Sequence, residues 1–308
     1  MTGIVKPVVL RLAASVVVLW GAATATFFLL QATPGRTVDV LLARTQAGPE
    51  VRAQIVADYR LDDSLPTQYL TYLERLVTGD FGSSYVLRRP VVDAIGGQLP
   101  YSLQLIAATL VLTVIASALL AVVSANRRRW VQSSFDAIES LVVAVPPFWL
   151  GLVLMGVFSF TLRWLPAIGA TSPLGLVLPA VALAAAPIAV LTRVLREGVL
   201  HALTEPFALT ARSRGLSEVA LRTRHVLRHA ALPATALLGW IAGSLIGGAV
   251  IIEIVFARPG VGRLMLSAVQ NKDMPVVTGV VLLAAAVFVV VTILVDLASR
   301  VIDPRVRG

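Results

Sequence analysis

The sequence predicts an all-α protein, a multi-pass transmembrane bundle of six helices, on three observations. Six stretches contain no Asp, Glu, Lys or Arg: 12–35, 94–126, 140–162, 164–192, 229–252 and 274–295. Each is longer than the roughly 20 apolar residues that a helix needs to cross a bilayer. Together they fill about half of the chain, which is more apolar helix than one soluble core can bury. Their apolar residues are continuous rather than alternating, which favours helices over barrel strands.

Composition excludes several other classes of protein. The chain has no Cys, so disulfides and thiolate metal sites are excluded. Its net charge of +9 could indicate nucleic-acid binding in a soluble protein. In a membrane protein we expect such charge to lie in cytoplasmic loops that contact anionic membrane lipid, and we predict no nucleic-acid partner.

The distribution of Lys and Arg predicts the orientation. One set of loops and termini carries Lys6, Arg11, Arg127–Arg129, the arginines between Arg193 and Arg228, Arg300, Arg305 and Arg307. The short opposite loops carry only Arg163, Arg258, Arg263 and Lys272. The positive-inside rule therefore predicts that both termini and the 193–228 loop are cytoplasmic. A cleaved signal peptide ending near Ala25 is the alternative for the N-terminus, and the apolar run that continues to Ala32 disfavours it.

Three regions follow along the chain. Region 1–32 contains helix 1, at about 8–31. Region 33–99 is too long for a simple connector, and we expect a small extracytoplasmic helical layer there. It contains a helix-like stretch at 50–61 and a second at 67–79, in which Tyr69, Tyr72, Leu73 and Leu76 recur at helical spacing and Gly79 ends the helix.

Region 100–308 contains the remaining helices, expected at about 100–125, 137–162, 172–192, 232–255 and 275–299. Pro146 and Pro147 should kink the third, and the kink could either line a pathway or serve static packing. In the fifth, Gly239, Gly243 and Gly247 form a stripe that should let another helix approach closely.

No catalytic constellation is present in the sequence. The only lysines, Lys6 and Lys272, follow Val5 and Asn271, so there is no Walker A loop. His225 and His229 lack the intervening Glu and a third ligand, so we predict no metal site. The acids Glu139, Glu253 and Asp296 lie near the ends of predicted helices, which disfavours a stand-alone proton-coupled carrier. We therefore expect no enzyme activity and no cofactor on this chain.

The cytoplasmic loop 197–230 carries the strongest functional signal. Thr204 is a candidate N-cap with Glu205 and Pro206 in the first turn, and Gly215 is a candidate left-handed stop. The resulting helix should expose Phe207, Ala208, Ala211, Arg212 and Arg214. Ser217 and Glu218 should begin a second helix that runs toward Pro233. Such a surface could enter a groove on a partner protein or rest on anionic headgroups, and periodicity does not separate the two.

Several motifs resemble the permeases of dipeptide and oligopeptide ABC importers, in particular their B-type subunit. They are TARSRGLS with the later HVLRHAALP, TPG at 33–35, the segment 61–84, RRPVVDAI at 88–95, the segment 256–277 and the terminal IDPRVR. The general importer motif opens with Glu-Ala-Ala. Here Leu209, Thr210 and Ala211 stand in that place without the acid, as is usual in the peptide branch. Arg36 replaces an acid that is frequent in the family.

The resemblance implies a type I importer permease fold in a bacterial inner membrane. It implies as partners a second homologous permease, ATP-binding cassette ATPase subunits that hold ATP and magnesium, and an extracytoplasmic substrate-binding protein. The residues that would couple to the ATPase are Glu205, Phe207, Ala208, Thr210, Ala211, Arg212, Arg214, Gly215 and Leu216. We expect the 256–277 loop to form a re-entrant turn that faces the binding protein or the pathway mouth, and the residues expected to face the binding protein are Pro259, Gly260, Gly262 and Arg263.

The sequence thus predicts a permease subunit for peptides. Nickel chelates, haem and glutathione are alternative cargoes within the resemblance, and a stand-alone secondary carrier is the alternative from another class.

Overall fold

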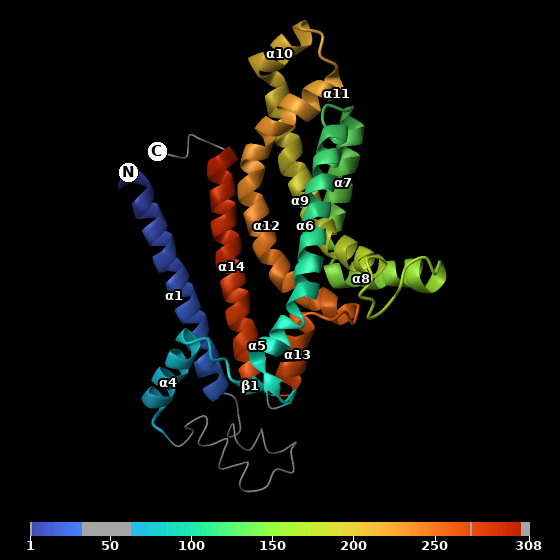
Figure 1. Cartoon of the computed structure of the whole chain (residues 1–308). Helices are drawn as coiled ribbons and strands as arrows, with labels where there is room; N and C mark the ends of the chain where they lie inside the picture. The colour runs from blue at the N-terminus through green and yellow to red at the C-terminus, as the bar shows by residue number, and fades with distance from the viewer. Residues whose placement is uncertain (1, 33–62, 85, 272, 303–308) are drawn as a thin grey trace. The chain divides into compact units, whose positions relative to one another are not determined.

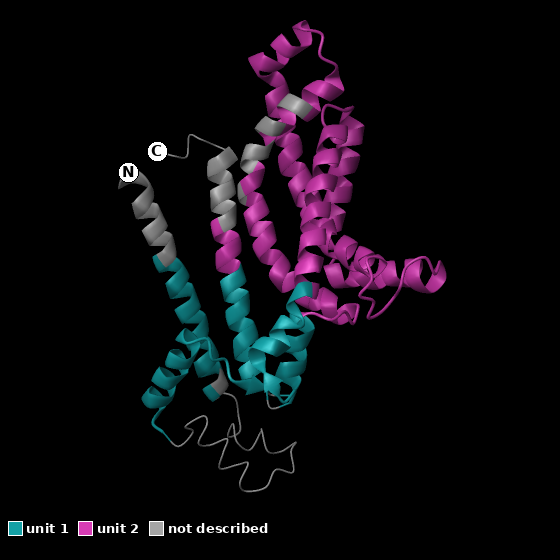
Figure 2. Ribbon diagram, viewed as in Figure 1, with its two compact units in different colours: residues 1–100, 261–287 teal, residues 101–260, 288–308 magenta. Residues whose placement is uncertain are grey.

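The computed structural model describes residues 2–32, 63–84, 86–271 and 273–302 (Figure 1). Contacts divide the chain into two compact units, residues 1–100 with 261–287 and residues 101–260 with 288–308 (Figure 2). The units do not follow the three regions expected from the sequence, because 261–287 packs with the first hundred residues. The expected helix at 50–61, the TPG segment at 33–35 and the last residues, 303–308, lie outside the described residues.

In the first unit, helix α4 (Leu65–Val77) packs against helix α1 (Thr2–Ala32). The ring of Phe27 lies 5.3 Å from that of Tyr69 and 5.4 Å from that of Tyr72, centroid to centroid. Thr24 Oγ1 and Tyr69 Oη share a hydrogen bond of 2.7 Å. The helix predicted after Pro66 is confirmed, and it already includes Pro66 because the first helical turn tolerates proline.

The rest of this unit surrounds a short antiparallel hairpin, β1 (Ser83–Ser84) and β2 (Arg89–Pro90). Helices α5 (Val91–Gly96), α13 (Val261–Gln270) and α14 (Met274–Ile302) follow, and the residues of α14 up to 287 belong to this unit. Their buried apolar side chains form one cluster, made of Val91, Ile95, Ala268, Val276 and Val280.

Helix α13 replaces part of the re-entrant turn expected at 256–277, and that expectation is wrong for this stretch. Val261, Leu264, Met265 and Ala268 recur at helical spacing and pack against the same cluster. Apolar packing therefore stabilises a helix here, although Pro259 and Gly260 lie just before it.

The second unit is a helical bundle. Its first half contains α6 (Leu99–Ser124), α7 (Arg129–Ala144), α8 (Pro147–Leu154) and the π-helix η1 (Met155–Thr161). Its second half contains α9 (Leu174–Thr204), α10 (Pro206–Ser213), α11 (Glu218–Ala220), the π-helix η2 (Leu221–Val226) and α12 (Leu227–Val255). Helix α9 packs against α12, α7 and α8. The core of the bundle includes Leu105, Leu183, Leu191, Ile241 and Leu245.

Within the described residues, four helical stretches are long and apolar enough to cross a membrane: Val91–Ser124, Leu174–Thr204, Leu237–Val255 and Met274–Ile293. A fifth is possible if α7 and the α8–η1 pair, which meet at an angle of 99°, together form one broken span. In α1 the apolar stretch that the structure describes is the shorter Ala13–Leu29. A multi-pass helical bundle is confirmed, whereas the count of six straight spans is approximate.

The bend between α7 and α8 lies where the sequence predicts a kink. Val145 is extended, with φ −82° and ψ 122°, as expected for a residue before proline. Pro146 and Pro147 then begin α8 without the backbone donors that would continue α7. Two consecutive prolines therefore break the helix instead of only bending it.

Close helix approach in the bundle involves glycines outside the predicted stripe. A Cβ on Gly198 of α9 would lie 2.9 Å from Cα of Ala230, and one on Gly248 of α12 would lie 2.8 Å from Cδ1 of Leu183. In the stripe, a Cβ on Gly243 would lie 3.2 Å from Phe288, and one on Gly247 would meet nothing within 4 Å. Gly239 lies half-buried in α12. Contact between α9 and α12 therefore depends on Gly198 and Gly248.

Candidate functional site

The segment that joins α9 to α12 is shorter than the predicted loop 197–230. Helix α9 continues to Thr204, and α12 begins at Leu227. Charged residues such as Arg196 and Glu197 end the apolar stretch, but they are good helix formers, so the helix continues beyond that stretch. The connecting segment is therefore 205–226, with α10 at its centre.

The ends of α10 are determined by local backbone chemistry. Glu205, not Thr204, is the N-cap residue, and Thr204 Oγ1 donates to the carbonyl of His201 at 2.7 Å, which corrects the predicted cap. Gly215 has φ +79°, as its predicted left-handed role requires. The N–H groups of Gly215 and Leu216 donate to the carbonyls of Arg212 and Ala211. This pair of bonds is the Schellman arrangement that closes a helix.

The segment turns back into α11 immediately afterwards. Ser217 Oγ accepts a hydrogen bond from the N–H of Ala220 at 3.3 Å and caps α11, so a helix begins here as predicted. Elements α11, η2 and α12 then follow one another without a break, through Pro233. The second helix predicted here is therefore the start of α12.

One face of α10 packs against the rest of the unit. Ala208 is fully buried in a cluster with Ala125, Val199, Leu221 and Val226, and Phe207 and Ala211 pack against that cluster. The expectation that Ala208 is exposed is therefore wrong. Its methyl group lets α10 lie close to α9 and to the end of α6.

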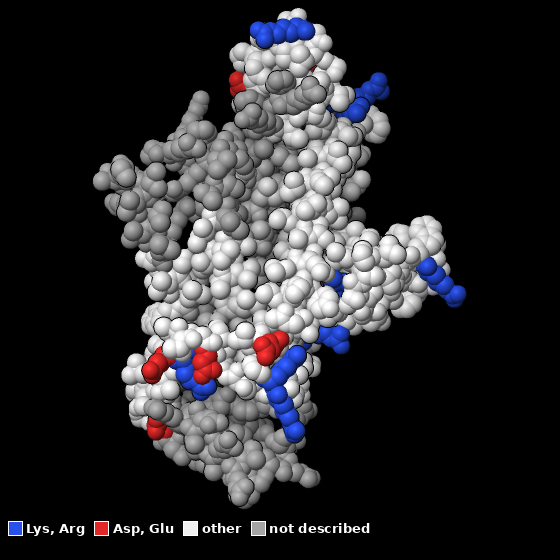
Figure 3. Space-filling model, viewed as in Figure 1, with Lys and Arg blue, Asp and Glu red and all other residues white. Residues whose placement is uncertain are grey.

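The other face of α10 is open. Leu209 is 67% exposed, and Val219 on α11 is 70% exposed. Thr210, Arg212, Ser213 and Arg214 are also exposed, while Leu216 and Glu205 are partly covered. In Figure 3 basic side chain atoms lie across the part of the surface formed by α10, and an acidic side chain lies near them. This open face combines an apolar residue, hydroxyl groups and guanidinium groups, so it suits contact with another protein.

A salt bridge closes α10 onto α11. The Nε of Arg212 donates to Glu218 Oε1 at 2.7 Å. This bond lowers the pKa of Glu218 from its usual value and raises the pKa of Arg212. Both side chains are exposed, so the pair contributes little to stability but favours one orientation of the turn.

Buried charges elsewhere in the unit were not predicted as a pair. Arg196 Nη1 and Nη2 donate to Glu139 Oε1 and Oε2 at 2.8 and 2.9 Å, and Arg196 also contacts Asp136 at 2.5 Å. Arg196 and Glu139 are both buried. The described structure thus gives Glu139 an arginine partner between α7 and α9, which a free proton relay would lack.

A second buried polar cluster lies around the end of α12 and the turn that follows it. Ser102 Oγ on α6 donates to Oε1 of Glu253 on α12 at 2.5 Å. Arg258 donates to the carbonyl of Ala170 at 2.9 Å, and burial lowers its pKa. A Cβ at Gly260 would overlap the carboxylate of Glu253, so any other residue there would displace that side chain.

The residues expected to face a binding protein are divided between the two units. Pro259 and Gly260 belong to the turn of the second unit. Gly262 is buried, and Arg263 is exposed, both on α13 of the first unit. Their role toward a binding protein stays a prediction from the sequence.

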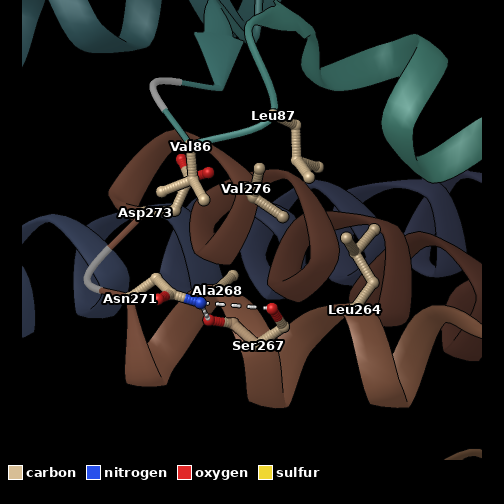
Figure 4. A pocket seen from close by; sticks show the side chains of 8 residues that line it. All are labelled: Val86, Leu87, Leu264, Ser267, Ala268, Asn271, Asp273 and Val276. Atoms are coloured by element: carbon tan, nitrogen blue, oxygen red, sulfur yellow. Dashed lines mark hydrogen bonds between the residues drawn. The ribbon is translucent and has the colours of Figure 1, made fainter.

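A small pocket lies in the first unit beside α13 (Figure 4). It is lined by Val86, Leu87, Leu264, Ser267, Ala268, Asn271, Asp273 and Val276. Asp273 is buried, and Ser84 Oγ donates to its carboxylate. Burial raises the pKa of Asp273, against the opposing effect of bonds from Ser84 and the backbone of Val86 and Val276. This carboxylate therefore ties the hairpin to the beginning of α14.

Among the described residues there is no group of three His, Asp or Glu side chains that could hold a metal ion. The features that this part of the chain does present are apolar spans, buried ion pairs and one exposed helical segment between two spans. The apolar spans are those of a multi-pass membrane protein.

Comparison with known proteins gives two family matches that together cover nearly the whole chain. Residues 114–308 match the binding-protein-dependent transport system inner membrane component family, and residues 4–106 match the N-terminal family of the same membrane components.

Individual relatives are named as permeases of transport systems, in agreement with the family matches. A protein of Brucella abortus (strain 2308) named as a peptide transport system permease is 36% identical over 306 residues, covering 96% of this chain and 97% of the relative. The glutathione transport system permease protein of Escherichia coli (strain K12) is 35% identical over 305 residues, covering 97% and 98%.

Proposed function

The chain belongs to the family of inner membrane components of binding-protein-dependent transport systems, and from that membership we propose that it is a permease subunit of an ATP-driven importer for peptides. In this proposal it forms half of a translocation pathway with a second, homologous permease. ATPase subunits bind ATP and magnesium and contact α10, and an extracytoplasmic binding protein delivers the cargo. The chain itself catalyses no reaction.

The observation that carries the proposal is the two-faced structure of α10. Its inner face is fixed by Ala208 in an apolar cluster, so the helix is held firmly against the bundle. Its outer face leaves Leu209 67% exposed, in a segment that also carries several arginines. A helix held on one side and open on the other can transmit a push from a soluble partner to the spans on either side of it.

The proposal places α10 in the cytoplasm, where ATP is available. The excess of arginine in the 193–228 segment over the short opposite loops supports this orientation. The turn after α12, with Pro259 and Gly260, would then lie on the extracytoplasmic side, together with α13.

Peptides are the proposed cargo because relatives named for peptide transport cover almost the full length of the chain. Glutathione, itself a small peptide, is the second candidate, because a permease named for it is nearly as similar.

A stand-alone secondary carrier is disfavoured by the partners of the buried acids. Glu139 is held by Arg196, and Glu253 accepts a hydrogen bond from Ser102. Carriers of that class need an acid that is free to exchange protons during transport.

The experiment is affinity purification of the tagged chain, expressed together with the ATPase subunits, second permease and binding protein proposed as its partners, followed by reconstitution. We expect the ATPases to co-purify and loaded binding protein to stimulate hydrolysis and uptake of labelled peptide. Leu209→Asp should release the ATPases, whereas Leu174→Asp, at a comparably exposed position away from α10, should not. Uptake driven by an ion gradient without ATPases would contradict the proposal.

A further inference from the structure

Arg222 connects the segment that carries α10 to the end of a different span, α6. Its Nη1 donates to the carbonyl of Ala125 at 3.2 Å and to that of Val122 at 3.3 Å. These carbonyls lie at the C-terminal end of α6, where backbone acceptors have no partner within the helix. A cation is also favoured there by the helix dipole.

A chain of charged groups leads from the exposed helix to this contact. Arg212 on α10 donates to Glu218 Oε1 at 2.7 Å, and Glu218 Oε2 lies 3.7 Å from Nε of Arg222. The Arg222 side chain is only 15% exposed, and its buried Nε makes no hydrogen bond. Arg222 is therefore held between Glu218 on one side and the end of α6 on the other.

Apolar packing follows the same route. Leu221 and Val226, at the two ends of η2, are fully buried in the cluster that contains Ala208 of α10 and Ala125. The wide turn of a π-helix is a feature often found at functional positions. One small core and one polar chain thus link α10, η2 and the end of α6.

We infer that Arg222 is a positioning residue that couples α6 to the movement of α10. This inference rests on the proposed function and deepens it. Direct chain connection joins α10 only to α9 and, through α11 and η2, to α12. Arg222 adds α6, from a part of the sequence about a hundred residues away, as a third helix that follows α10.

Arg127 provides a matched control. Its Nε also donates to a carbonyl at the end of α6, that of Val123, at 2.9 Å. Arg127 itself closely follows α6 in the sequence, so this bond does not join α6 to another element. Arg127→Gln therefore removes one positive charge and one cap from α6 without separating α6 from η2. Arg222→Gln removes a charge and a cap and also breaks the link.

The first measurement uses the full-length chain in nanodiscs without its partners. Spin labels are attached to cysteines introduced at Val123 and Ser213, which are both exposed, in a chain with no native Cys. Pulsed electron resonance should give a narrow distance distribution in the otherwise unaltered chain and with Arg127→Gln, and a clearly broader one with Arg222→Gln. Arg222→Lys should be intermediate, because one ammonium group cannot contact the carbonyls and Glu218 as a guanidinium does.

The second measurement uses the assembled transporter. With Arg222→Gln the ATPases should remain bound and basal hydrolysis should persist, while the stimulation by loaded binding protein falls about fivefold or more, the usual range of a coupling effect. Arg127→Gln should keep normal stimulation.

The outcomes separate the inference from the function on which it rests. A narrow distribution and normal stimulation in Arg222→Gln would overturn the inference alone, as would equal losses in Arg127→Gln and Arg222→Gln. Absence of ATPase binding by the unaltered chain would overturn the proposed function, while the distance measurement would still report whether Arg222 holds α6 to the α10 segment.

Discussion

The guanidinium of Arg196 lies in register with the carboxylate of Glu139, with Nη1–Oε1 at 2.8 Å and Nη2–Oε2 at 2.9 Å. Both side chains are buried, and they join α9 to α7. Removal of one partner leaves a charge without compensation, which typically costs about 3–5 kcal/mol.

We expect Glu139→Ala to lower the thermal unfolding midpoint strongly, measured on the purified chain in detergent. The double variant Glu139→Leu, Arg196→Met should recover most of the loss, because no buried charge then remains. A Glu139→Ala variant as stable as the unaltered chain would show that the pair makes no net contribution.

The orientation can be tested by thiol labelling. Thr67 and Ser213 are exposed, so a cysteine at either position should be reachable from its own side of the membrane. In intact cells an impermeant maleimide should label the position 67 variant and not the position 213 variant. Both should react after permeabilisation. The reverse pattern would contradict a cytoplasmic α10.

The left-handed conformation of Gly215 predicts a graded series of substitutions. Its φ is +79°, and a Cβ there would meet no atom within 4 Å, so the only cost comes from the backbone. Gly215→Val should cost about 1–2 kcal/mol and weaken ATPase stimulation, measured in proteoliposomes. Gly215→Asn should behave nearly as glycine does, because asparagine tolerates this conformation. Equal activity of the valine and asparagine variants would mean that the turn is not needed.

Adjacent glycines on α12 should respond in opposite ways. Gly248→Ala should destabilise the bundle, since its Cβ would lie 2.8 Å from Cδ1 of Leu183. Gly247→Ala has open space and should be neutral, or stabilising by up to about 1 kcal/mol through helix propensity. The check is the unfolding midpoint of the two variants in the same detergent. Destabilisation by Gly247→Ala as large as that by Gly248→Ala would contradict the open space beside Gly247.

The buried carboxylate of Asp273 predicts a dependence on pH. Its pKa is raised from 3.8 by burial, so the folded state binds the proton more tightly than the unfolded state does. Stability of the hairpin and α13 should be greatest below about pH 3.8 and should fall as pH rises through the raised folded pKa. Hydrogen exchange at residues 86–90 and 268–271 would measure this.

In Asp273→Asn the same segments should show no pH dependence of exchange in that window beyond the intrinsic chemistry of the amides. A pH profile identical to that of the unaltered chain would mean that another group is responsible.

Local signals in the sequence were enough to predict several features of the fold. Helix α4, the left-handed Gly215 and the helix start at Ser217 and Glu218 each depend on residues within a turn or two, so spacing and residue type determine them. The sequence also predicts a multi-pass membrane protein, because uncharged apolar stretches of this length are typical of membrane-spanning helices.

The features that depend on distant contacts could not be predicted in this way. Glu139 and Arg196 are 57 residues apart, and the residues around either one give no indication that the other is its partner. Ala208 looked like part of an open face because its burial depends on Ala125 and Val226. The extent of α9 was missed for another reason, since hydropathy detects the membrane boundary and not the end of the helix.

The burial of Ala208 has a kinematic consequence for α10. Rotation of the helix about its own axis would expose Ala208 and Phe207 and force Arg212 toward an apolar cluster, and both changes are unfavourable. Tilting or sliding of α10 together with its neighbours requires neither change. A force applied at Leu209 should therefore displace the segment as a rigid body, with little rotation of α10 about its own axis. The direction of that displacement is then determined by the packing of one methyl group.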